Sequence, residues 1–164
     1  MPNVTVSIDP GLRHLGLATF CDETLTYAGL IKNPETTARG PKAWVAMAEV
    51  VAREVDDRVL MTHDFASEVP QVYARGPGDP ADLLELAGVV GAVAAVIGAG
   101  RATGYLPRVW KGQVPKAVMC RRIEDRLSDD EKDAVEKCPA SLRHNVLDAI
   151  GIGLYHLGRL GKVP

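Results

Sequence analysis

Three acidic residues stand where carboxylates from separate elements of the chain could meet. Asp9 ends the first apolar strand, Glu68 follows the fourth expected strand, and Asp148 lies near the start of the last expected helix. Carboxylates this close together cannot all stay ionised unless a cation offsets their charge. Mg²⁺ takes oxygen ligands and commonly binds a few carboxylates together with phosphate oxygens. The set predicts phosphodiester hydrolysis, in which two Mg²⁺ ions about 3.5–4 Å apart activate a water and stabilise the leaving oxygen.

Each acid also has a purely structural interpretation when it is considered alone. The Asp-Pro-Gly segment at Asp9 is a sensible turn, Glu68 could be an exposed loop acid, and Asp148 could pair with Arg143. The combination favours the metal site, provided that the strands before Asp9 and Glu68 are neighbours and the last helix packs across their ends.

Two further candidate ligands precede Asp148 by about one helical turn. His144 is four residues and Asn145 three residues before Asp148, so both share its face of a helix. A histidine there can bind metal or move a proton to the attacking water or the leaving group. We therefore expect His144 to take part in metal binding and catalysis beside Asp148.

The elements that must position these residues follow from hydrophobic periodicity. The sequence predicts strands over 3–9, 15–20, 24–31, 58–65 and 102–106, and helices over 42–55, 80–98, 116–127 and 141–160. A short helix opens at Ser128 with a capping-box pattern, and Asp79 before Pro80 is a typical helix start. The first three strands form an expected antiparallel meander. The whole is an α/β protein, a five-stranded mixed sheet flanked by helices in the order of the ribonuclease H fold.

Two segments stand out within this outline. The second half of the helix over 80–98, from Gly88 to Ile97, is apolar on all sides and is expected to be buried, either under the sheet or against a second subunit. The segment 107–115, which contains Trp110 and Lys111, is expected to be a loop.

Composition places the chain among ordinary globular proteins. Its 164 residues indicate one domain over 1–164, and the net charge of −2 mildly disfavours a nucleic-acid partner without excluding it. The three cysteines have no zinc-ligand spacing and are expected to be free thiols in a reducing compartment. No signal peptide is apparent, and the longest apolar run, 87–99, is too short to span a bilayer. We expect a cytoplasmic protein, in the host cytoplasm if it is phage-encoded, with no membrane partner.

Several segments resemble the RuvC family of Holliday-junction resolvases. They are Ile8–Gly11 with Gly16–Ala18, the strand end at Glu68, and Asp148–His156; the segment Trp110–Lys116 is similar to phage-type members. The resemblance implies a ribonuclease H-like homodimer that nicks two strands of a four-way DNA junction at symmetric positions during recombination and repair. It also implies that Mg²⁺ or Mn²⁺ is bound by the acids. Asn145 stands at the family's fourth acidic position, with His144 one residue earlier, so the resemblance implies a fourth ligand here, for which we expect His144, with Asn145 as the alternative.

Basic residues near these segments are candidate DNA contacts. Phosphate contacts position a substrate without reading its sequence, and Trp110 could either stack on a base or anchor its loop in the core. The predicted DNA-binding residues are Arg13, Arg75, Trp110, Lys111, Lys116, Arg121 and Arg122, with His14 near the same turn.

Other functions share parts of this pattern. A YqgF-type nuclease acting on RNA has the same fold and the same Asp-x-Gly opening. A catalytically weak junction-binding protein would keep the DNA-binding surface but would not cleave the junction. The Asp-Pro-Gly turn also resembles the phosphate loop of actin-like nucleotide-binding proteins, but those need two such domains and a much longer chain than 164 residues.

Overall fold

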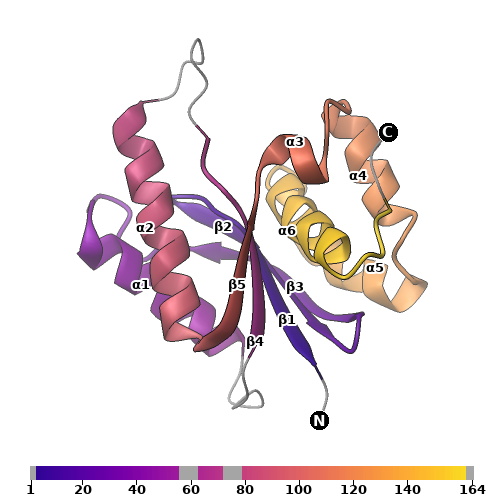
Figure 1. Ribbon diagram of the computed structural model, residues 1–164, viewed down its shortest axis with the longest axis horizontal. Helices are drawn as coiled ribbons and strands as arrows, with labels where there is room; N and C mark the ends of the chain where they lie inside the picture. Colours follow the sequence, from indigo (N-terminus) through magenta and orange to yellow (C-terminus); the bar gives the residue numbers. More distant parts are fainter. Residues whose placement is uncertain (1–2, 56–62, 72–78, 162–164) are drawn as a thin grey trace.

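The computed structural model describes residues 3–55, 63–71 and 79–161, with only the backbone described at 63. A central sheet separates two layers of helices (Figure 1). Across the described residues, no helix combines the length and the apolar character needed to cross a membrane.

The sheet has five strands of mixed direction. They are β1 (Val4–Asp9), β2 (His14–Cys21), β3 (Thr24–Lys32), β4 (His63–Glu68) and β5 (Ala99–Tyr105). Their order is β3-β2-β1-β4-β5. β1, β2 and β3 pair antiparallel, whereas β4 lies parallel to both β1 and β5. The predicted meander, the mixed sheet and the neighbouring positions of β1 and β4 are confirmed.

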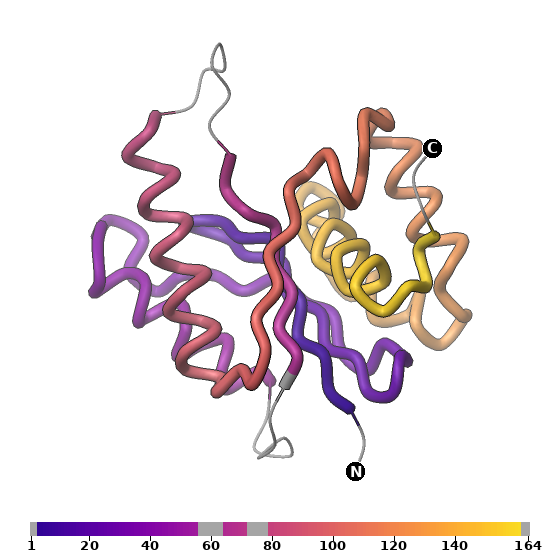
Figure 2. Tube along the Cα trace, in the orientation of Figure 1, coloured from indigo at the N-terminus to yellow at the C-terminus, as the bar shows by residue number. Residues whose placement is uncertain are grey.

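Helices cover both faces of this sheet. α1 (Pro41–Val55) and α2 (Pro80–Val96) lie on one side, and the other side carries α3 (Pro107–Trp110), α4 (Lys116–Glu124), α5 (Asp129–Glu136) and α6 (Arg143–His156). Figure 2 follows the chain as β4 and β5 pass between the two layers. The predicted ribonuclease H-like order of elements is therefore the observed one.

Two helix starts have the caps that their sequences predict. The Asp79 carboxylate accepts a hydrogen bond from the Ala81 N–H at 2.9 Å. At α5, the Ser128 hydroxyl accepts from the Glu131 N–H at 3.3 Å, while the Glu131 carboxylate accepts from the Ser128 N–H at 2.8 Å. Both caps satisfy backbone donors that have no partner within the helix.

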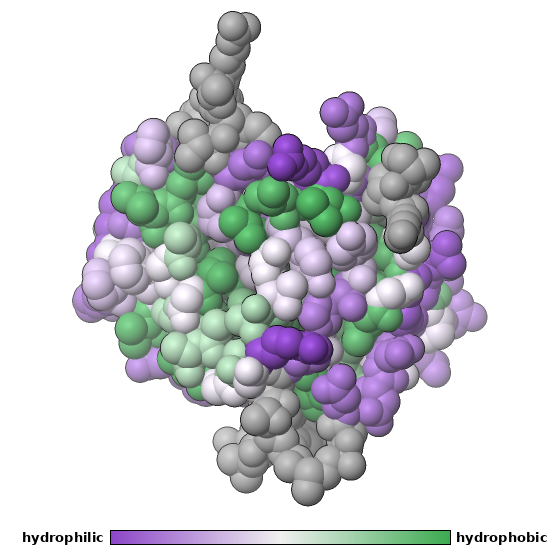
Figure 3. Space-filling model, viewed as in Figure 1, coloured by the Kyte–Doolittle hydropathy of each residue, from purple (hydrophilic) through white to green (hydrophobic). Residues whose placement is uncertain are grey.

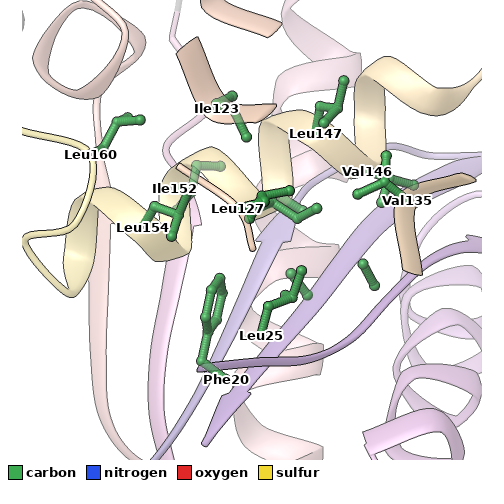
Figure 4. Packing of buried hydrophobic residues seen from close by; sticks show 14 of the residues in the cluster. Phe20, Leu25, Ile123, Leu127, Val135, Val146, Leu147, Ile152, Leu154 and Leu160 are labelled. Atoms are coloured by element: carbon green, nitrogen blue, oxygen red, sulfur yellow. The ribbon is translucent and has the colours of Figure 1, made fainter. Parts of the chain in front are cut away.

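Each face of the sheet has its own apolar core. Val6 and Ile8 of β1 pack with Met47 of α1 on one face. On the other, α6 lies between the sheet and α4, with Phe20 reaching up from β2 and Ile123 down from α4 (Figure 4), while α5 packs beside α6 directly on β3. The eight residues that α6 buries between 146 and 154 make it the central helix of that layer.

The structure differs from three expectations. Burial of Gly88–Ile97 under the sheet is wrong, because the fully buried residues of α2 are Val89 and Val93 and the rest of the helix is partly or fully exposed; burial against a second subunit stays a prediction. The segment 107–115 is not simply a loop, because Pro107 starts the short helix α3. β4 also runs on to Glu68, beyond the predicted end at Phe65.

Candidate active site

Side chains along β1 point alternately to the two faces of the sheet, and this alternation directs Asp9 toward α6. Val6 and Ile8 face the core beneath α1 and α2, so residues 5, 7 and 9 face the opposite side. Ser7 confirms this direction, because its hydroxyl donates to the Ala149 carbonyl of α6 at 2.8 Å. Asp9 is therefore the last residue of a strand whose α6-facing side chains lead directly to the start of that helix.

Strand pairing brings Glu68 beside Asp9. β1 and β4 are parallel, and their register pairs Ile8 with Ser67. Asp9 and Glu68 follow at the next position of each strand, at the same edge of the sheet. The two acids are 59 residues apart in sequence (68 − 9) and become neighbours only through this register.

Glycines allow α6 to approach closely enough to bring Asp148 to the same edge. A Cβ on Gly16, which pairs with Asp9 across β2, would lie 2.0 Å from the Asn145 carbonyl oxygen. A Cβ on Gly153 would lie 2.2 Å from the Phe20 ring. Neither distance is possible for a real side chain, so both positions require glycine for this packing.

The three predicted acids influence one another strongly. Burial, followed by the charges of Asp148 and Glu68, raises the pKa of Asp9 from 3.8 to about 8, against the opposing effect of Lys111 and Lys116. Burial also raises the Asp148 pKa, against the opposing effect of Lys111. The structure therefore brings together the acids that the sequence singled out, in an environment where negative charge is costly.

Glu68 is bound by two neighbouring residues of the short segment after β5. Its Oε2 accepts a hydrogen bond from Trp110 Nε1 at 2.9 Å and lies 3.0 Å from Lys111 Nζ. Lys111 Nζ is also 3.9 Å from Asp148 Oδ2. Burial alone would lower the Lys111 pKa, but Asp148 and Glu68 raise it above its usual value. The ammonium is thus held in the charged state between two of the acids.

His144 and Asn145 occupy the first turn of α6, one turn before Asp148. The charge of His144 helps to lower the Asp148 pKa, which places the imidazole within electrostatic reach of that carboxylate. The backbone of Asn145 packs against Gly16 of β2. Both residues lie on the predicted face, and the choice of fourth ligand remains a prediction.

The carboxylates of Asp9, Glu68 and Asp148 have the chemistry to bind a divalent cation, although their side chains are not arranged around a single metal position. Three carboxylates from β1, β4 and α6 supply hard oxygen ligands at one edge of the sheet. Among the described residues, no group of three or more His, Cys, Asp or Glu side chains is arranged so that it could hold a metal ion. Glu68 instead directs its carboxylate to Trp110 and Lys111.

The predicted DNA-binding residues fall into different environments. Trp110 is completely buried, so in this structure it anchors its segment in the core, the second of its two predicted roles. Arg122 is partly buried and donates to the Leu160 carbonyl at 3.2 Å. Arg13, Lys116 and Arg121 are exposed, and His14 and Lys111 are partly buried. Arg75 lies outside the described residues.

The contact between Trp110 and Glu68 is the feature that the sequence did not reveal. A tryptophan next to a lysine indicated a DNA-contacting loop, but Pro107 at the first position of α3 is the signal of a short helix there. That helix turns the indole inward and places its N–H on the Glu68 carboxylate.

Comparison with known proteins supports the same architecture. No family model matches the sequence, and no curated protein matches it. Two solved structures are similar over almost the whole chain. Thermus thermophilus RuvC has a TM-score of 0.64 and 21% identity, with 97% of each chain covered. The chain has the RuvC fold. T. thermophilus RuvC in complex with a Holliday junction substrate has a TM-score of 0.56 and 20% identity, covering 97% of this chain and 96% of that one.

Proposed function

We propose that this protein is a Mg²⁺-dependent endonuclease that resolves four-way DNA junctions. The observation that carries the proposal is the convergence of Asp9, Glu68 and Asp148 on one edge of a RuvC-like sheet. The similar T. thermophilus protein is bound to a Holliday junction substrate. Clustered acids that repel one another and a fold shared with a junction-bound protein together favour phosphodiester hydrolysis on branched DNA.

The proposed roles follow from the positions of the side chains. Two Mg²⁺ ions held by Asp9, Glu68 and Asp148 would supply the activated water and the stabilisation of the leaving oxygen. His144, one turn before Asp148, would serve as the fourth ligand or carry the proton released at the cleaved bond. Lys116, exposed beside the acids, would hold a phosphate of the DNA backbone.

We also propose that the protein acts as a homodimer through the outer face of α2. Leu84 is 74% exposed and Val96 45% exposed, and Ala87, Gly91 and Ala95 lie exposed on the helix between them. An apolar groove of about 310 Å³ runs between this helix and β5. Green and pale surface follows α2 in Figure 3. A two-fold dimer would present two equivalent active sites to a junction that has approximate two-fold symmetry.

The dimer is tested by replacing Leu84 with Glu. A charge at this exposed apolar position should shift the molecular mass measured by sedimentation equilibrium from dimer toward monomer without loss of helix content. The matched control is Val118→Glu on α4, which is 54% exposed and lies in the other layer. A monomeric wild-type protein, or a dimer that is unaffected by Leu84→Glu, would rule out this surface.

The activity is tested by cleavage of three substrates of matched sequence: a four-way DNA junction, linear duplex DNA and a structured RNA. We expect nicking of the junction with Mg²⁺ and none with chelator, and Asp9→Asn should abolish cleavage while junction binding survives. Cleavage of RNA in preference to the junction would favour the YqgF-type alternative. Tight junction binding with no cleavage by the wild type would identify a binding protein.

A further inference from the structure

Lys111 lies among the acids in a position where it offsets their charge. Its Nζ is 3.0 Å from Glu68 Oε2 and 3.9 Å from Asp148 Oδ2, and its charge acts on Asp9 as well. The Lys111 side chain is only 30% exposed, and those of Glu68 and Asp148 are 19% and 16% exposed. Screening by solvent is weak at such partly buried pairs, so the ammonium neutralises the cluster from within.

Neighbouring contacts hold this lysine in place. Lys111 Nζ lies 4.8 Å from the centre of the Trp110 ring, within range of a cation–π interaction. Trp110 itself is buried and donates to the same Glu68 oxygen that Lys111 contacts. The lysine, the indole and the carboxylate therefore form one connected unit, in which two nitrogen atoms already engage Glu68 Oε2.

We propose that Lys111 is a built-in counter-cation that competes with divalent metal for Glu68 and Asp148 and must leave them when metal binds. This inference rests on the proposed metal-binding function of the three acids. The protein without DNA should therefore bind metal weakly. A phosphate of bound DNA would give the displaced ammonium a new anionic partner, so that metal loading is coupled to the presence of substrate.

The first test measures Mn²⁺ binding to the DNA-free protein by calorimetry in wild type, Lys111→Met and Lys111→Gln. Removing a cation 3–4 Å from two carboxylates should tighten Mn²⁺ binding by about tenfold or more. Lys137→Met is the matched control, because Lys137 is an exposed lysine at the end of α5, outside the group of acids. Its effect should stay within about threefold, since charges across solvent are screened.

The second test follows the movement of the lysine. The chain has two tryptophans, so Trp44→Phe leaves Trp110 as the sole indole. Saturating Mg²⁺ should change its emission in this background, because the ammonium leaves the ring, and the change should shrink when Lys111→Met is added. Equal emission changes in both backgrounds would overturn the inference.

The two proposals can fail separately. If wild type binds Mn²⁺ and Lys111→Met binds it no more tightly, the competition is refuted and the metal site stands. If neither protein binds Mn²⁺, the inference falls together with the metal site. Junction cleavage is not needed for any of these measurements, so the substrate assignment is tested independently.

Discussion

Replacing Asp9 with Asn should stabilise the metal-free protein and flatten its dependence on pH. The folded protein raises the Asp9 pKa from 3.8 to about 8 through burial and the neighbouring carboxylates. Between these pH values the folded state retains a proton that the unfolded chain releases. The free energy of unfolding therefore falls as pH rises from about 4 to about 8. Above pH 8 the whole of this loss of stability is present. Asn carries no charge at any pH, so the variant lacks this cost.

The size of this effect on stability follows from the shift in the Asp9 pKa. One pKa unit corresponds to about 1.4 kcal/mol, so the cost at pH 7 has an upper limit of roughly 4 kcal/mol. Side chains rearrange and water enters partly buried sites, which reduces such costs, so we expect Asp9→Asn to raise the free energy of unfolding at pH 7 by about 1–3 kcal/mol. At pH 5 the gain should be smaller, because pH 5 lies closer to the unfolded-state pKa of 3.8, so keeping Asp9 protonated in the folded state costs less free energy.

The assay is urea unfolding in chelator at pH 5, 7 and 8.5, monitored by circular dichroism. Asp133→Asn, at an exposed position of α5, is the control and should leave the pH profile unchanged. Added Mg²⁺ should stabilise the wild type more than Asp9→Asn, because metal offsets the charge that the variant has removed. Parallel pH profiles for wild type and Asp9→Asn, or a less stable variant at pH 7, would refute the account of this site.

Three further substitutions test the packing of the fold and the ion pair between Glu131 and Arg159. Gly16→Ala would place a methyl group 2.0 Å from the Asn145 carbonyl oxygen, so urea unfolding should show a loss of about 1–3 kcal/mol. Gly91→Ala in α2, where nothing lies within 4 Å of the added carbon, should be neutral or stabilising; equal losses for both would contradict this packing. Burial opposes ionisation of Glu131, but the Arg159 guanidinium and backbone N–H groups lower its pKa to about 2. Glu131→Gln should therefore cost about 3 kcal/mol at pH 7 and progressively less as pH falls toward 2, and a constant cost across pH would argue against this ion pair.

The convergence of the acids could be predicted because it depends on simple periodicities. Alternation along β1 places Val6 and Ile8 on one face and therefore Asp9 on the other. The order of elements makes β1 and β4 neighbours, and the helical spacing of α6 places His144 one turn from Asp148. These are properties of local pattern and chain order, which the sequence contains.

The contacts of Glu68 could not be predicted in the same way. They depend on how α3 is oriented against α6, which is decided by packing between residues distant in sequence, such as Trp110 near Gly151. The sequence also could not decide between the two predicted coverings of α2, because an apolar helix surface has the same sequence whether a sheet, another subunit or solvent lies against it. Within this chain, Val89 and Val93 are the only residues of α2 that are fully buried.

The most direct test of the proposed function uses a supercoiled plasmid that extrudes one cruciform. A dimer with two equivalent sites built on Asp9, Glu68 and Asp148 should cut both symmetric strands during one binding event with Mg²⁺. The account predicts linear plasmid as the first product of the wild type and no product from Asp9→Asn. Accumulation of singly nicked circles, or undiminished cleavage by Asp9→Asn, would contradict it.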